Sequence, residues 1–136
     1  MTHDEFFSRY LHAGPIGRDA NAVAALFAED GVFEAPLVPA GHHLPRLLEG
    51  RAAIRAGIRQ YHQDLDVPGA VNIQESRYCL HTVDPSTFVV EIDTVFDLPD
   101  GSRSTMSFVQ IFRLRDGKIA RLRDYFSVDG AGGSVD

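Results

Sequence analysis

Residues 87–127 decide the fold, and they read TFVVEIDTVFDLPDGSRSTMSFVQIFRLRDGKIARLRDYFS. Runs rich in β-branched and aromatic residues alternate here with short turns at Pro99-Asp100-Gly101 and Asp116-Gly117. Turns of this chemistry join neighbouring antiparallel strands. An earlier extended run is separated from this segment by Asp84-Pro85. We expect four strands, at residues 71–82, 87–97, 103–114 and 118–127.

The N-terminal part instead carries apolar residues at helical spacing. Thr2 and Glu5 have the spacing of a capping box, and Gly14-Pro15 is expected to end the first helix. We expect helices at 3–13, from Asp19 to the turn at Gly31, and from Gly50 to residues 66–69, with a short strand at Val32-Phe33. This order predicts an α+β domain: N-terminal helices packed on a strongly curved antiparallel sheet, a cone-shaped barrel with an internal pocket.

Composition narrows the class of protein. A chain of 136 residues that is 44% hydrophobic and 24% charged has the size and make-up of one globular domain. We expect that domain at residues 1–129, followed by a flexible Gly-rich tail at 130–136. The net charge of −6 and the scattered basic residues exclude a general nucleic-acid surface.

Cysteine content and hydropathy indicate the compartment. Cys79 is the single cysteine, so a disulfide scaffold is excluded and a reducing compartment is favoured. No apolar run approaches the ~20 residues of a membrane span, and the acidic start is unlike a signal peptide. The sequence therefore predicts a cytoplasmic domain with neither membrane nor nucleic-acid partners.

Alternation along the last strand places one carboxylate on an apolar face. Asp124 shares that face with Leu122 and Phe126, because side chains two apart in a strand point the same way. Burying an unpaired carboxylate costs several kcal/mol or raises its pKa. Asp124 therefore either has a structural partner or is kept for chemistry, and the pattern alone leaves both open.

Other polar residues in apolar company are harder to place. In the strand at 87–97, Glu91 and Asp93 oppose an apolar face, and alternation alone puts them in solvent. They would line the interior only if a second subunit covered the apolar face. Gln110, in the next strand, and Tyr10, in the first helix, lie among apolar residues, and each either contacts a ligand or satisfies a neighbour.

The histidines give no metal-binding pattern. His42-His43 lies in a long Pro-rich loop, where it either reaches a ligand or is solvent-exposed. Cys79 and His81 would share a strand face, but the pair is too generic to indicate a nucleophile. Because none of the six histidines has metal-ligand spacing, we expect no metal and no cofactor.

Two stretches together resemble a known superfamily. Ala25–Pro36 followed by Leu48–Ile54 resembles the start of nuclear transport factor 2-like (NTF2-like) proteins, and Ile111–Phe126 resembles their closing hairpin. The superfamily includes ketosteroid isomerase, SnoaL-like polyketide cyclases, limonene-epoxide hydrolase and phenazine-biosynthesis pocket proteins. The resemblance covers residues 5–127 and implies a cone of curved sheet closed by helices.

The active-site pattern is most similar to that of limonene-epoxide hydrolase. Its Arg-x-Asp, Leu-Pro-x-Gly and Arg-Asp-Tyr-Phe motifs correspond here to Glu91-Ile92-Asp93, Leu98-Pro99-Asp100-Gly101 and Arg123-Asp124-Tyr125-Phe126. The resemblance implies that Asp93 acts as general acid and Asp124 as general base, since carboxyls with separated pKa values can give and take a proton.

The chain also departs from these patterns. The family's bridging arginine is replaced by Glu91, and its water-positioning tyrosine and asparagine by Phe33 and Ala35. Of the ketosteroid isomerase residues, the general-base and oxyanion-hole aspartates fall near Ala35 and Gln110, and only the helix tyrosine has a match, in Tyr10.

Two hypotheses follow. The first is a SnoaL-like enzyme that isomerises, cyclises or hydrolyses a small, largely apolar cyclic metabolite. Its catalytic residues would be Asp124 and Asp93, and its substrate-binding residues Tyr10, Phe33, Glu91, Gln110 and Phe126. The second is a non-catalytic ligand-binding or dimerisation module in which Tyr10 or an arginine pins Asp124. Both predict a homodimer through the sheet, because the apolar face of the central strands needs covering.

Overall fold

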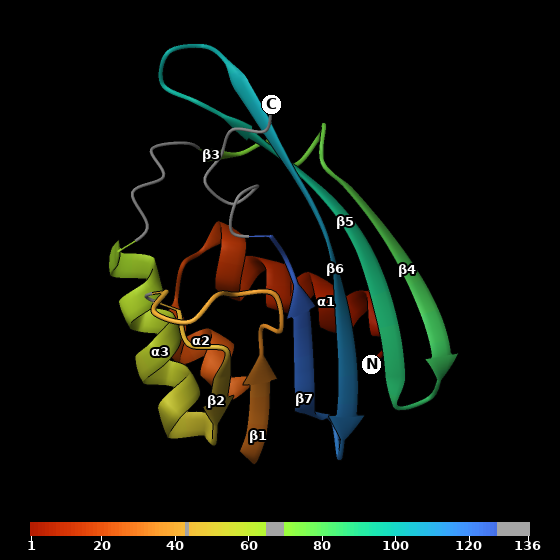
Figure 1. The fold of residues 1–136 in the computed structure, drawn as a ribbon. Coiled ribbons are helices and arrows are strands. Elements are labelled where there is room, and N and C mark those ends of the chain that lie inside the picture. The colour runs from red at the N-terminus through yellow and green to blue at the C-terminus, as the bar shows by residue number, and fades with distance from the viewer. Residues whose placement is uncertain (43, 65–69, 128–136) are drawn as a thin grey trace.

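A computed structural model describes residues 1–42, 44–64 and 70–127, and its N-terminal helices pack on a strongly bent sheet (Figure 1). The expected α+β class is confirmed. The helices are α1 (His3–Leu11), α2 (Ala20–Ala25) and α3 (Arg51–Asp64), with a π-helical turn η1 (His12–Ile16) after α1. The strands are β1 (Phe27–Glu34), β2 (Leu47–Glu49), β3 (Ala70–Val71), β4 (Arg77–Asp84), β5 (Thr87–Asp97), β6 (Arg103–Arg115) and β7 (Lys118–Tyr125).

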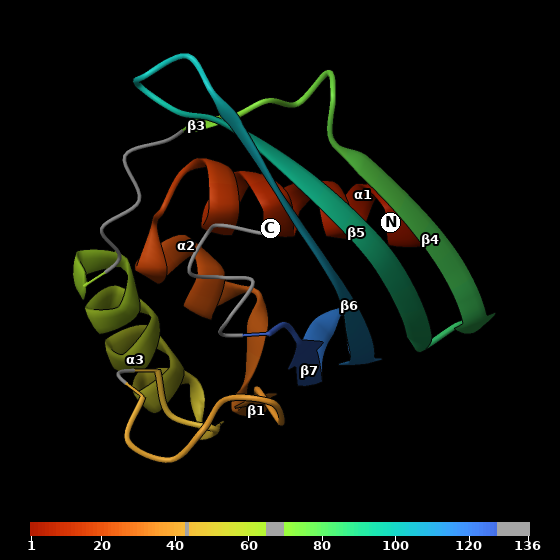
Figure 2. The ribbon, with the colours of Figure 1, turned by 45° about the horizontal axis from the view of Figure 1, so that its top comes forward.

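The sheet is mixed rather than purely antiparallel. In the described part of the chain, seven strands pair in the order β2-β1-β7-β6-β5-β3, and β4 also pairs with β5. The partners are antiparallel except for β1 and β7, which run parallel. The parallel pair joins the N-terminal half of the chain to the C-terminal half, and Figure 2 shows α2 and α3 beside β1 at that end of the sheet.

The second helix is shorter than the sequence predicts. It ends at Ala25, and the chain is already extended from Phe27, where a helix as far as Gly31 was expected. Gly31 approaches the neighbouring strand closely, since a Cβ added there would lie 2.8 Å from the Ile119 carbonyl oxygen. Pairing with β7 thus overrides the helical spacing of these residues.

The first helix covers the apolar face of the central strands. The expected capping box is present: Thr2 Oγ1 accepts from the Glu5 amide at 3.1 Å, and Glu5 Oε1 accepts from the Thr2 amide at 2.8 Å. The helix then continues into η1, which contains Pro15, rather than ending at Gly14-Pro15. The buried aromatic residues of α1 and the inner face of β5 and β6 are Phe6, Phe7, Tyr10, Phe88 and Phe112.

This packing changes the argument for a second subunit. The sequence did not show what packs on the sheet face that carries Phe88 and Phe112. In the structure α1 of the same chain packs on it. The exposed face of β5 is the one that carries Glu91 and Asp93, as alternation alone predicts. A dimer is therefore not needed to bury the inner face.

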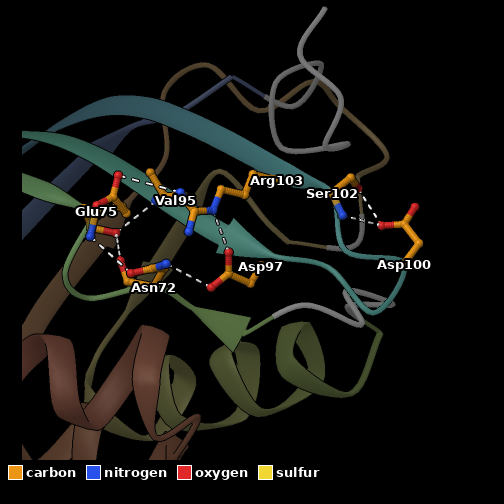
Figure 3. Close-up of polar contacts among 8 residues, drawn as sticks. Asn72, Glu75, Val95, Asp97, Asp100, Ser102 and Arg103 are labelled. Atoms are coloured by element: carbon orange, nitrogen blue, oxygen red, sulfur yellow. Dashed lines mark hydrogen bonds and ion pairs between the residues drawn. The ribbon is translucent and has the colours of Figure 1, made fainter.

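The first expected strand is interrupted by a turn that is tied to the β5–β6 hairpin (Figure 3). Asn72 Oδ1 accepts from the Glu75 amide, and Asn72 Nδ2 donates to Asp97 at 2.9 Å. Arg103 Nε binds Asp97 at 2.9 Å, and its Nη1 lies 3.6 Å from Glu75. These contacts explain why the run expected at 71–82 divides into β3 and β4.

Some expectations fall outside the described residues. These are the end of the third helix at 66–69, the tail at 130–136, and His43. Within the described ranges, no helix is both long enough and apolar enough to cross a membrane.

Candidate functional site

Asp124 is buried on the inner face of the sheet, as the sequence predicts. It lies on β7 with only 8% of its surface exposed, between the buried Leu122 and Phe126. Gln110 is its cross-strand partner on β6 and is also buried. Gln110 Nε2 donates a hydrogen bond of 3.0 Å to Asp124 Oδ2. The two polar residues that alternation placed among apolar neighbours therefore contact each other.

The Asp124–Gln110 pair retains unused acceptors. Asp124 Oδ1 and Gln110 Oε1 are both buried and have no hydrogen-bond partner among the described residues. Burial raises the pKa of Asp124 from its ordinary 3.8 to about 7, and the hydrogen bond from Gln110 opposes that rise. A carboxyl with such a pKa gains and loses its proton near neutral pH, which is the property that a catalytic acid or base needs.

Two tyrosines from different helices lie in the electrostatic environment of Asp124. Burial, and then the negative charge of Asp124, raise the pKa of Tyr10 on α1 and of Tyr61 on α3. For Tyr10 the side-chain amide of Gln110 acts in the opposite direction and lowers the pKa. Both phenols keep their protons at neutral pH and so stay hydrogen-bond donors.

Tyr61 was not predicted as a site residue. It lies three residues after Ile58 in the expected third helix, a spacing that puts both on one apolar face, and nothing in the sequence relates that face to Asp124. The packing of α3 beside β1, which pairs with β7, brings Tyr61 to the same region as Asp124.

The structure does not bring Asp93 and Glu91 to Asp124. Asp93 accepts a hydrogen bond from Ser107 Oγ at 2.6 Å, and Glu91 contacts His81 at 2.7 Å, both on the exposed face of β5. Because β5 and β6 pair without a register shift, residues of odd and even number lie on opposite faces. Geometry therefore does not support the acid–base pair that the resemblance implies, nor a substrate contact by Glu91.

The remaining predicted residues form apolar surroundings. Phe33 and Phe126 are buried in the same core cluster as Tyr10. The arginines flanking Leu122 do not pin Asp124, since Arg121 and Arg123 both form ion pairs with Glu34. His42 belongs to its own loop, where its Nδ1 accepts from the Leu44 amide at 3.1 Å.

Two surface hollows on the helical side of the described residues lie away from Asp124. One, of about 580 Å³, lies between α2, α3 and the start of β7, and the other, of about 610 Å³, adjoins it beside α2 and α3. The first is lined by Asn21, Ala25, Arg51, Arg55, Arg59 and Lys118. The internal pocket expected around Asp124 remains a prediction.

Comparison with known proteins gives one family match. A model of the SnoaL-like domain matches residues 7–122. The uncharacterised protein YesE of Bacillus subtilis strain 168 is 28% identical over 120 residues, which cover 88% of this chain and 78% of YesE.

Solved structures share the whole architecture. A proposed isomerase from Bacillus subtilis is 26% identical with a TM-score of 0.70, and the alignment covers 98% of each chain. TerC, crystallised with polyporic acid, is 19% identical with a TM-score of 0.66 over 93% of this chain and 92% of its own. Similarity at the level of TerC shows the fold alone.

Proposed function

The chain belongs to the SnoaL-like domain family, and from this membership and the buried carboxyl we propose an enzyme in which Asp124 moves a proton on a small, largely apolar cyclic metabolite. The fold is the NTF2-like, ketosteroid isomerase-like one, whose members include isomerases, cyclases and epoxide hydrolases. Fold alone does not give an activity, so the proposal rests on the site.

The observation that carries the proposal is a buried carboxyl with a pKa of about 7, whose Oδ1 has no hydrogen-bond partner in the described part of the chain. As a carboxylate, Asp124 takes a proton from a carbon next to a substrate carbonyl, and the electron pair moves to the carbonyl oxygen. A tyrosine hydroxyl, from Tyr10 or Tyr61, donates a hydrogen bond to that oxygen and stabilises its charge. The protonated Asp124 then returns the proton.

The position of the returned proton separates two reactions. When the substrate is an unsaturated ketone, return of the proton to the far carbon of its dienolate moves the double bond, which is an isomerisation. Attack of the enolate carbon on a second carbonyl, with the proton delivered to the new alkoxide, is a cyclisation. Either needs only one carboxyl. Hydrolysis by two opposed aspartates has less support, because Asp93 lies on the outer face.

The similar proteins support this class of ligand. A protein of the same fold was crystallised with polyporic acid and another with trimethylamine. Tyr10, Phe33 and Phe126 belong to one buried cluster, so the surroundings of Asp124 have the apolar character that such a ligand requires.

A non-catalytic binding module is the second candidate. Gln110 gives Asp124 a structural partner, and the hollows described above lie beside α2 and α3. In this alternative Asp124 holds β6 to β7 and fixes the orientation of a ligand.

Substitution of Asp124 by Asn separates the two candidates. Thermal-shift screening against cyclic terpenoid, steroid and polyketide-like ketones identifies a bound compound, and its α-proton exchange in D₂O is followed by NMR. We expect Asp124→Asn to bind the compound within severalfold of wild type but to lose at least ~100-fold in exchange rate, the scale of general acid–base catalysis.

The matched control is Asp93→Asn, which removes an exposed carboxylate from the neighbouring sheet region and should change the exchange rate less than twofold. Exchange that persists in Asp124→Asn at the wild-type rate would leave the binding module as the explanation.

We also propose a homodimer through the outer face of the sheet. Val109 and Tyr125 are paired across β6 and β7 on that face and are half-buried in the single chain, and Ile111 lies beside them on β6, two strands from β4. Sedimentation at micromolar concentration should give the mass of a dimer, and Ile111→Arg should convert it to monomer by placing a charge in the interface. A wild-type monomer at that concentration would contradict the proposal.

A further inference from the structure

We propose that Cys79, His81 and Glu91 form a binding site for a zinc-like divalent transition-metal ion on the outer face of the sheet. Cys79 and His81 lie two residues apart on one face of β4, and Glu91 on β5 is the cross-strand partner of Cys79. One ligand atom from each side chain lies within 4.8 Å of the other two.

The three groups converge on a single ring nitrogen. His81 Nε2 is 3.5 Å from Cys79 Sγ and 2.7 Å from Glu91 Oε1. In a nucleophilic triad the carboxylate instead binds the ring nitrogen that faces away from the nucleophile. One proton on Nε2 cannot bridge both neighbours well, whereas a cation between them satisfies all three lone pairs. The arrangement therefore favours metal binding over a cysteine nucleophile.

The distances suit tetrahedral zinc. With Zn–S and Zn–N bonds of ~2.3 and ~2.05 Å at the tetrahedral angle, sulfur and nitrogen lie ~3.5 Å apart, which matches the contact between Cys79 and His81. Glu91 must withdraw from His81 by a fraction of an ångström, and it is free to do so because 62% of its side chain is exposed.

The ligand set selects the kind of metal. A thiolate with an imidazole and a carboxylate suits zinc and related ions, while magnesium and calcium prefer oxygen ligands alone. Three protein ligands leave a fourth position for water or an added ligand. Spacing along the chain could not reveal the site, since the third ligand comes from the neighbouring strand through the β4–β5 register.

Cobalt(II) is the probe for the first experiment. Reduced, metal-free protein is titrated with Co²⁺ and then with Zn²⁺. We expect a thiolate-to-cobalt charge-transfer band and intense visible bands of tetrahedral cobalt, both removed by zinc. Cys79 is the only cysteine, so the charge-transfer band assigns it as a ligand. Absence of this band from the wild-type protein at saturating cobalt would overturn the proposal.

Variants test each ligand against a matched control. Cys79→Ser should abolish the charge-transfer band. Removing a residue that only hydrogen-bonds to a metal ligand typically lowers metal affinity by ~10–100-fold. Loss of a ligand itself should cost at least as much, so His81→Gln and Glu91→Gln should each raise the zinc Kd at least tenfold. Asp93→Asn, on the same exposed face of β5, should leave the Kd unchanged. Equal weakening by Asp93→Asn and Glu91→Gln would mean that only diffuse negative charge attracts the ion.

A second measurement needs no variant. Alkylation of Cys79 by iodoacetamide should slow at least tenfold in saturating Zn²⁺ and stay unchanged in Mg²⁺, because a coordinated thiolate is a poor nucleophile. An alkylation rate that zinc does not change would contradict the site independently of how the variants fold.

Discussion

The Asp124→Asn variant is expected to be more stable than the wild-type protein by about 4 kcal/mol at pH 8 and about equally stable near pH 3. In the folded state the pKa of Asp124 is about 7, whereas its ordinary value is 3.8. One pKa unit corresponds to about 1.4 kcal/mol. The difference between the two pKa values therefore gives a free-energy penalty of about 4 kcal/mol once the carboxyl must ionise inside the protein.

The sign follows from proton binding. Below pH 3.8 both the folded and the unfolded chain hold the Asp124 proton, so this carboxyl adds no pH dependence. Between pH 3.8 and about 7 only the folded state retains it, and the wild type loses stability with each unit of pH. Above about pH 7 the penalty is complete and constant. Because Asn does not ionise in this pH range, the Asp124→Asn variant does not lose this stability as the pH rises.

Urea unfolding of both proteins from pH 3 to pH 8 measures the effect. The stability difference should grow across that range and level off above pH 7. Asp93→Asn serves as the control, because its carboxylate is exposed and bonded only to Ser107 among the described residues. A difference between Asp124→Asn and wild type that stays constant with pH would show that Asp124 titrates normally.

The Phe112→Ala variant is expected to lose about 3–5 kcal/mol of unfolding free energy, the usual cost of deleting a fully buried phenylalanine. Phe112 has no exposed surface and stacks on Phe88 with ring centroids 4.7 Å apart. The rings of Phe7 and Tyr10 on α1 meet it edge-on at 5.9 and 5.2 Å. The cavity left by alanine would therefore weaken the contact between α1 and the sheet.

Phe108→Ala is the matched control for Phe112→Ala. Phe108 lies four residues earlier on the same face of β6 but is only half-buried, so its loss should be less than half as large. Urea unfolding with an unchanged m-value measures both. Similar losses of unfolding free energy in the two variants would contradict the prediction that packing against α1 makes Phe112 the more important residue.

The strands were predictable where two local signals agreed. Between Thr87 and Tyr125, side-chain alternation and turn residues both indicated a meander, and the structure has β5, β6 and β7 there. At Phe27 and Ala28 the prediction of a helix was wrong, because apolar residues at this spacing suit a strand as well as a helix. The choice was made by a parallel partner distant in the sequence, which local patterns do not contain.

The sequence predicted which face of the sheet each site residue occupies, but not which residues contact each other. Parity alone placed Asp124 and Gln110 inward, and both are buried. Their contact depends on the register between β6 and β7, which includes an irregularity after Arg113 that no pattern announces. For Asp93, alternation and family resemblance gave opposite faces. Alternation agrees with the structure, since it follows from the strand's own geometry.

The parallel pairing of β1 with β7 also determines how the chain assembles. Phe27 meets Ile119 across about 90 intervening residues, and closing such a loop is entropically costly, so contacts of this kind form late. The antiparallel pairs from β4 to β7 join strands that are consecutive in the chain, and they can form before β1 is paired with β7. During synthesis, β1 leaves the ribosome long before β7 and must wait with an open edge. Completion of the sheet at β1 therefore depends on β7, which follows the other six described strands in the chain.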